Sequence, residues 1–72
     1  MNVTYDYYRV FYYVARCGSF TRAAQALLSN QPNVSKAIRN LENQLGCALF
    51  ARSHRGVQLT EAGERLYAHV RI

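Results

Sequence analysis

The stretch from Asn30 to Gly46, NQPNVSKAIRNLENQLG, carries the strongest structural pattern in the chain. Asn30 can cap a helix N-terminus, Pro32 falls in the first turn, where its missing N–H costs nothing, and Gly46 can end the helix. Apolar residues recur at the i, i+4, i+7 and i+11 spacing of one helix face: Val34, Ile38, Leu41 and Leu45. The opposite face is polar and basic, with Asn33, Ser35, Lys36, Arg39, Asn40 and Asn43. We therefore predict a helix over residues 31–45 with one face in a core and the other available to a partner.

Two patterns that precede this helix predict two more. From about Thr4 to Cys17, one apolar stripe at helical spacing consists of Tyr8, Phe11, Tyr12 and Ala15. Gly18 can end that helix. A short helix should follow, with Ser19 or Thr21 as its N-terminal cap and with its end near Leu28. A short helix, a tight turn and a longer helix with a basic face together indicate a helix-turn-helix.

The residues after Gly46 predict a β-hairpin and a further helix. Two short apolar-bearing runs, Ala48–Arg52 and Val57–Thr60, flank a glycine-containing turn at 53–56. Thr60 can cap a last helix, which has no stop signal before Ile72, so we expect it to continue beyond this chain. Its apolar side is Ala62, Leu66, Tyr67 and Val70. The predicted fold is mainly α, a winged helix-turn-helix over residues 1–59 followed by the start of another helix over 60–72.

The charge of the chain indicates an anionic partner. Its 72 residues carry nine Lys and Arg against four Asp and Glu, a net charge of +5. Residues 31–55 hold four of the basic residues and one acid, which gives +3, whereas residues 56–72 are neutral. A basic balance favours nucleic acid over a membrane surface. Duplex DNA is preferred to RNA, because the major groove of B-form DNA admits a helix and that of A-form RNA does not.

Composition also excludes several classes of protein. Half of the residues are apolar, which excludes disorder, but no apolar run is long enough to span a membrane. The N-terminus does not resemble a secretory signal, and two cysteines cannot support a disulfide scaffold, so a reducing cytoplasm fits best. Cys17, Cys47, His54 and His69 lack the spacing of metal sites. No catalytic constellation is present either, so we expect neither an enzyme, a metal nor a cofactor.

Five segments, taken in order, resemble the N-terminal DNA-binding region of LysR-type transcriptional regulators. They are GSFTRAA at 18–24, NQPNVS at 30–35, IRNLE at 38–42, LGCALFAR at 45–52 and RGVQLTEAG at 55–63. The resemblance implies a bacterial transcription factor whose small-molecule effector binds in a C-terminal domain outside this chain. It also implies a homodimer, formed through the first helix and a long linker helix beginning near Thr60, that binds double-stranded DNA at an interrupted inverted repeat.

The start of the 31–45 helix holds the predicted base-reading residues. Gln31 and Pro32 match the Gln-Pro pair of the family, where glutamine can bond adenine and proline can touch a thymine methyl. Ser35 and Lys36 match the Ser-Arg/Lys pair one turn later, and Lys36 can reach a guanine or a phosphate. Asn33 is placed on the same leading edge, either as a base reader or simply as a polar residue of the first turn.

Three further residues are predicted at phosphates rather than bases. Arg39 lies one turn beyond Ser35 and suits a phosphate clamp. Thr21 and Arg22 open the short helix, which crosses the DNA backbone in such folds. For Thr21, simple helix capping is the alternative.

The predicted wing contributes another set of contacts. Arg52 and Ser53 precede the turn and Arg55 lies in it, at positions that touch phosphates and the minor groove in the family. Arg52 could instead pair with Glu42 inside the domain. His54 is predicted to be a turn residue.

Surplus aromatic surface leaves a second function open. Tyr5, Tyr12 and Tyr13 on the first helix, with Leu66, Tyr67 and Val70 on the last, could pack within the chain, form a subunit interface, or do both. A winged helix that docks a protein is therefore the alternative function. Such a module has no need for a basic recognition face, which favours DNA.

Overall fold

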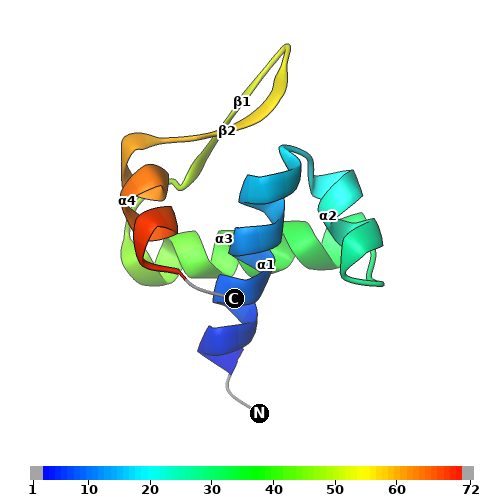
Figure 1. The fold of residues 1–72 in the computed structure, drawn as a ribbon. Helices are drawn as coiled ribbons and strands as arrows, with labels where there is room; N and C mark the ends of the chain where they lie inside the picture. The colour runs from blue at the N-terminus through cyan, green and yellow to red at the C-terminus, as the bar shows by residue number, and fades with distance from the viewer. Residues whose placement is uncertain (1–2, 71–72) are drawn as a thin grey trace.

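A computed structural model describes residues 3–70, with side chains from Asp6 onward, as four helices and one hairpin. In chain order the elements are α1 (Val3–Cys17), α2 (Phe20–Ala26), α3 (Gln31–Leu45), β1 (Phe50–Ser53), β2 (Gly56–Leu59) and α4 (Glu61–His69). Helices α1, α2 and α3 pack together, and the hairpin projects from them as a wing (Figure 1). The predicted fold class, a mainly helical winged helix-turn-helix, is confirmed.

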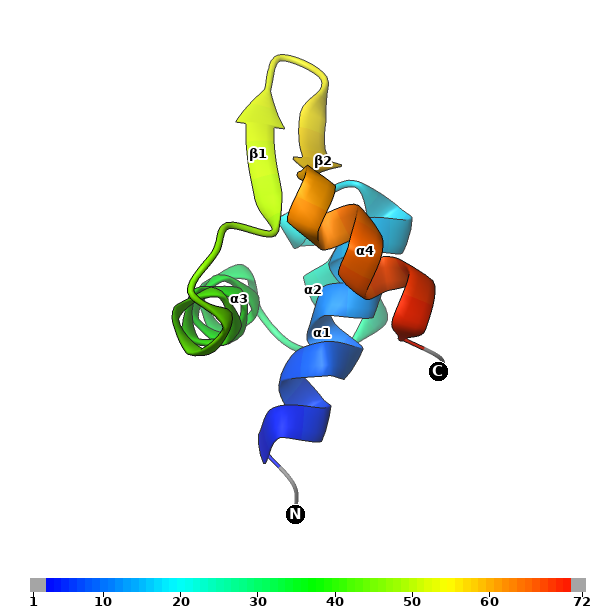
Figure 2. The same ribbon diagram turned by 90° about the vertical axis from the view of Figure 1, so that its left-hand side faces the viewer.

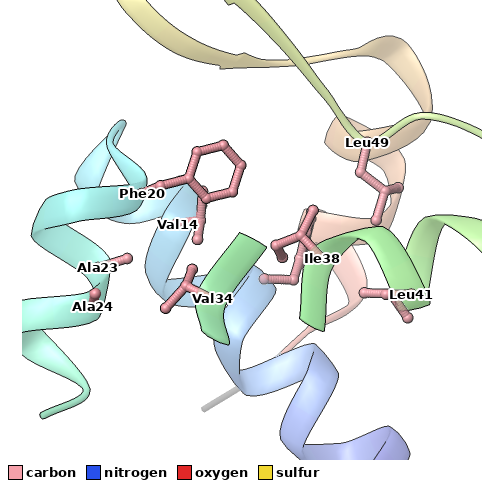
Figure 3. Packing of buried hydrophobic residues seen from close by; sticks show 9 residues of the cluster. Val14, Phe20, Ala23, Ala24, Val34, Ile38, Leu41 and Leu49 are labelled. Atoms are coloured by element: carbon pink, nitrogen blue, oxygen red, sulfur yellow. The ribbon is translucent and has the colours of Figure 1, made fainter. Parts of the chain in front are cut away.

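The ends of α3 follow the caps that its sequence predicts. The Asn30 side chain accepts a hydrogen bond from the Asn33 N–H at 2.9 Å, and Gly46 adopts the left-handed conformation with φ of 73°. Val34, Ile38 and Leu41 are buried against α1 and α2 (Figure 3). Leu45 was expected in this stripe, but it is 42% exposed. The last turn of α3 lies at the edge of the bundle, where Leu49 of the following loop fills the core instead.

The structure of α2 selects one of the two predicted N-terminal caps and ends the helix earlier than predicted. Ser19, rather than Thr21, is the cap, since its Oγ accepts the Arg22 N–H at 3.2 Å. The helix ends at Ala26, two residues before the predicted end. Leu28 adopts φ of 55° in the α2–α3 turn and is 95% exposed. The chain reverses there because Leu28 leaves the helical conformation.

The hairpin pairs Phe50 with Leu59 and Ser53 with Gly56, around a turn made by His54 and Arg55. The predicted turn is confirmed, and Gly56 supplies the positive φ, 102°, that such a turn requires. The predicted first strand began too early. Ala48 and Leu49 precede β1 because they do not pair with β2. The Leu49 N–H donates to the Glu42 carboxylate of α3, and the Ala48 and Leu49 carbonyls accept hydrogen bonds from Thr60, the cap of α4.

Helix α4 starts where Thr60 predicts, with the Thr60 Oγ1 accepting the Gly63 N–H at 3.1 Å. It passes in front of α1 in Figure 2. The two helices meet through side chains, since the rings of Tyr12 and Tyr67 stack with centroids 5.6 Å apart. The sequence predicted a helix that continues to Ile72, but within the described residues the helix is shorter. Helix α4 ends at His69, whose ring bonds the Arg65 carbonyl, and Val70 is extended. Residues 71–72 lie outside the described part.

Gly63 joins α4 to the base of the hairpin. It is buried, and a Cβ at this position would overlap the Leu49 carbonyl oxygen and approach Leu59 Cδ2 to 2.9 Å. Only a residue without a side chain allows α4 to lie this close to the loop before β1. Across the described residues, no helix is both long and apolar enough to cross a membrane.

Candidate nucleic-acid interface

The solvent-facing side of α3 is a basic surface. Pro32, Lys36, Arg39 and Asn43 are exposed and lie opposite the buried Val34–Leu41 stripe. Glu42 is the only acidic residue in the helix, and its carboxylate turns toward the loop before β1. Glu42 lines the edge of α3 toward β1 together with Arg39, but its carboxylate is engaged by backbone N–H groups and forms no ion pair with an arginine of this surface.

Gln31 and Ser35 form a pair at the start of α3. The Gln31 Nε2 donates to the Ser35 Oγ at 2.9 Å, and both side chains are half-buried. This bond holds the Gln31 amide against the flank of the helix that faces the hairpin. An amide fixed in this way loses little further freedom when its remaining donor and acceptor meet a base edge.

Asn33 does not lie beside Ser35, although the sequence predicted both residues on the same leading edge of this helix. Two residues along an α-helix turn through about 200°, so the two side chains occupy opposite flanks. Asn33 borders a hollow of about 310 Å³ with Asp6 and Arg9 of α1. The predicted residues at the start of α3 are therefore spread around the helix: Gln31 and Ser35 lie toward the hairpin, Pro32 and Lys36 face solvent, and Asn33 lies toward α1.

A groove of about 190 Å³ separates α3 from β1. Its polar rim includes Ser35, Arg39 and Arg52, whereas Phe20, Ile38 and Phe50 contribute its apolar wall. The Arg52 guanidinium lies over the Phe20 ring, with Cζ 4.8 Å from the centroid. A guanidinium held by an aromatic face keeps its N–H groups free for an anion, and two arginines beside one groove match a phosphate.

The alternative in which Arg52 pairs with Glu42 is wrong. The Glu42 carboxylate accepts the backbone N–H groups of Leu49 and Phe50 instead. Within residues 3–70, the ion pair that forms is Arg65 with Glu61 on the surface of α4. Arg52 is consequently positioned by its stacking on Phe20, and its charge is not neutralised within the domain.

At the tip of the wing, Ser53 and Arg55 have different surroundings. The Ser53 Oγ accepts the Arg55 N–H at 3.2 Å and donates to the Gly56 carbonyl at 3.4 Å, so this hydroxyl braces the turn. The Arg55 side chain is exposed. Figure 1 shows the tip well separated from α3, so any ligand that meets both must be extended.

The start of α2 adds Thr21 and Arg22, both exposed. Because Ser19 is the cap, the Thr21 hydroxyl is left for another partner. Phe20 and Glu42 were not among the predicted site residues, yet both shape the groove. The sequence identifies Phe20 only as an apolar residue. Its spacing does not predict the contact with Arg52, which lies 32 positions later in the chain.

The cysteines and histidines do not gather into a site. Cys47 is exposed and Cys17 half-buried, and neither forms a disulfide. In the described part of the chain, no three His, Cys, Asp or Glu side chains lie close enough together to hold a metal ion.

The aromatic face between α1 and α4 is a separate feature. The Arg16 Nη1 donates to the Tyr12 hydroxyl at 3.1 Å, and this bond raises the pKa of Arg16 above its already high ordinary value. Tyr12 also contacts Tyr13 edge-on and stacks on Tyr67. The predicted packing of the first helix on the last is thus present within one chain. The side chain of Tyr5 lies outside the described residues.

Comparison with known proteins identifies a family match over most of the chain. Residues 5–64 match the family described as bacterial regulatory helix-turn-helix protein, lysR family. A probable RuBisCO transcriptional regulator of Cyanidioschyzon merolae is 48% identical over 92% of this chain. The HTH-type transcriptional regulator BudR of Klebsiella aerogenes is 54% identical over 85% of it. The chain spans 22% and 43% of the lengths of these two relatives.

Solved structures agree with this assignment. The chain resembles the CbnR DNA-binding domain in its DNA complex, with a TM-score of 0.86 and 35% identity, over 96% of this chain and 77% of that one. It resembles the BenM DNA-binding domain in complex with catB site 1 DNA equally closely, with a TM-score of 0.86 and 38% identity, over 96% and 74% of the two chains. The fold is therefore that of domains crystallised on DNA.

Proposed function

Since this chain belongs to the LysR family of helix-turn-helix transcriptional regulators, we propose that it recognises specific double-stranded DNA through α3 and the wing. The observation that carries this proposal is the groove between α3 and β1, where Arg39 and Arg52 flank one hollow and neither is paired with a carboxylate. The likeness to the CbnR and BenM DNA-binding domains, both solved with DNA, supports it.

We assign different tasks to different parts of the surface. Helix α3 enters the major groove, where Gln31, Pro32 and Lys36 meet base edges and Asn33 adds a contact from the α1 side. The groove lined by Ser35, Arg39 and Arg52 receives a backbone phosphate. Beside it, α2 and the wing hold the duplex through Thr21, Arg22, Ser53 and Arg55. The wing reaches the backbone or the minor groove, where a narrow groove attracts arginine.

Two copies of the chain would bind one site. The stacked tyrosines belong to α1 and α4, neither of which lines the groove between α3 and β1, and we assign to their face a homodimer that spans an interrupted inverted repeat. Helix α4 would then form the start of the linker segment over residues 60–72, and an effector domain would follow this segment in the whole regulator. This role is binding rather than catalysis, and it places the protein in the cytoplasm with the chromosome.

A selection experiment tests the proposal. The protein is incubated with random duplexes, and bound sequences are recovered over several rounds. Affinity for the selected duplex is then measured between 50 and 300 mM salt. We expect an inverted repeat and a log–log salt slope of about −5, as for about six phosphates contacted per dimer. Failure to bind heparin or any duplex at low salt would favour a protein-docking winged helix.

A further inference from the structure

Glu42 holds the segment of chain that leads from α3 into the wing. Its Oε2 accepts the Leu49 N–H at 2.8 Å and, more weakly, the Phe50 N–H at 3.4 Å. Phe50 is the first residue of β1. A carboxylate that accepts backbone N–H groups forms stronger hydrogen bonds than a neutral acceptor would. The acid on α3 is therefore engaged in joining α3 to the first residues of the hairpin.

The carbonyl groups of the same segment are held from the other side. The Thr60 Oγ1 donates to the Ala48 carbonyl at 2.7 Å, and the Thr60 N–H donates to the Leu49 carbonyl at 3.0 Å. The segment thus binds α3 through its donors and the start of α4 through its acceptors. Its direction is determined by both attachments together.

Apolar contacts alone do not fix this direction. Leu49 is buried. The centroid of the Phe50 ring lies 5.3 Å from that of the Phe11 ring and 6.0 Å from that of the Phe20 ring. Such contacts keep the base of the hairpin on the core, but they are non-directional and tolerate rotation. A hydrogen bond is directional, and the Glu42 bonds lie at the point where β1 begins. A small rotation there is magnified at Arg55, in the turn at the far end of the hairpin.

We propose that Glu42 is a positioning residue for DNA recognition, which fixes the wing relative to α3 so that one duplex can meet both. This inference rests on the proposed function. It opposes a simple electrostatic expectation, because Glu42 is a negative charge within the basic 31–55 region. If only its charge mattered, its removal would tighten DNA binding. If it positions the wing, its removal weakens binding although the net charge becomes more positive.

A double-mutant cycle measures this positioning. Arg55→Ala and Lys36→Ala are each made in the wild-type protein and in Glu42→Ala, and affinity for the selected duplex is compared. We expect Glu42→Ala to weaken binding about tenfold. Arg55→Ala should cost about tenfold in the wild type and less than about threefold in Glu42→Ala, because a displaced wing no longer makes the contact. Lys36 lies on the exposed face of α3, outside the groove between α3 and β1, so Lys36→Ala should cost the same in both backgrounds.

Two control variants separate position from charge and folding. Glu42→Gln keeps a carbonyl acceptor without the charge, and it should restore most of the cost of Arg55→Ala. Glu64→Ala removes an exposed carboxylate from α4 and should not weaken binding. The proposal is overturned if Arg55→Ala costs as much in Glu42→Ala as in the wild type. It is also overturned if the costs of Arg55→Ala and Lys36→Ala disappear together, since that is general loss of structure.

A measurement without DNA keeps this inference separate from the proposed function. Residual dipolar couplings give the orientation of the hairpin relative to α3, and amide exchange reports the Leu49 and Phe50 N–H groups. We expect faster exchange at both amides and a reoriented hairpin in Glu42→Ala, with smaller changes in Glu42→Gln. If the wild type binds no duplex, the proposed function fails. An unchanged hairpin orientation in Glu42→Ala overturns the positioning role in either case.

Discussion

Three arginines in residues 6–70 lie over aromatic rings, and two of them, Arg52 and Arg16, lie over rings that differ by one hydroxyl. Arg52 lies over Phe20 at 4.8 Å in the groove beside α3, and Arg16 lies over Tyr12 at 5.8 Å on the α1–α4 face. Phenylalanine offers only its ring face, so the donors of Arg52 stay available. Tyr12 adds an oxygen that accepts a bond from Arg16.

This difference indicates that a contact between an arginine and an aromatic ring can have two different roles. On the α1–α4 face, the cation and the hydroxyl satisfy each other and stiffen the surface of a single chain. In the groove, the aromatic ring orients a cation and leaves its hydrogen-bonding capacity for an incoming anion. In these two pairs, the hydroxyl decides whether the guanidinium is engaged within the chain or keeps its donors for a ligand.

The largest expected effect comes from breaking the joint that both regions share. Gly63→Ala would force α4 away from the Leu49 carbonyl, and we expect a loss of about 3 kcal/mol in the free energy of unfolding. Urea unfolding followed by circular dichroism measures it. Gly46→Ala is the matched control, because a Cβ there meets nothing and only the positive φ costs, about 1 kcal/mol. Equal losses in the two variants would show that the joint is not tightly packed.

The second largest effect is expected from a variant on the groove side that separates base reading from phosphate binding. Gln31→Ala removes the amide that is held by Ser35, and we expect discrimination between selected and random duplexes to fall by about 2 kcal/mol. Affinity for random duplex should change little. Competition binding with both duplexes checks this. Equal losses on the two duplexes would remove Gln31 from base recognition.

The two arginines themselves give a direct test of the comparison. Arg52→Ala should weaken binding to selected and random duplexes alike, by about tenfold at moderate salt, and reduce the salt slope by about one. Arg16→Ala, the matched loss of charge on the other face, should leave the slope nearly unchanged. If both variants lower the slope equally, net charge rather than the groove governs binding.

The smallest effect is expected from removing the hydroxyl that distinguishes the two rings. Tyr12→Phe should keep the stack on Tyr67 and leave DNA affinity unchanged. The hydrogen bond to Tyr12 raises the pKa of Arg16. The stability that this bond contributes is therefore present at low pH, and it would be lost only at a pH above the ordinary pKa of arginine. Wild type and Tyr12→Phe should therefore differ by the same small amount from about pH 5 to 9 in thermal unfolding. A difference that changes within this range would assign the pair another titrating partner.

The features that the sequence predicted correctly are those written in neighbouring residues. Asn30 and Gly46 mark the ends of α3, and Thr60 marks the start of α4, because capping depends on groups within three or four positions. Local rules become ambiguous where two residues qualify. Both Ser19 and Thr21 can cap, and only the surrounding packing selects Ser19.

The features that could not be predicted depend on distant residues meeting. Leu45 continues the apolar spacing, but whether a neighbour covers it depends on where the loop places Leu49. The charges of Arg52 and Glu42 favour an ion pair, yet Phe20 and two backbone N–H groups compete for them successfully. Asn33 was grouped with Ser35 by its neighbourhood in sequence, although helix geometry separates them.

The wing is a sheet of only two strands, each four residues long, so each strand has one edge without a partner in residues 3–70. Exposed edges are places where chains pair with one another and aggregate. Arg52 on β1 and Arg55 in the turn make such pairing repulsive between copies. The same cations that suit the wing to DNA therefore protect the unbound protein from self-association through its hairpin.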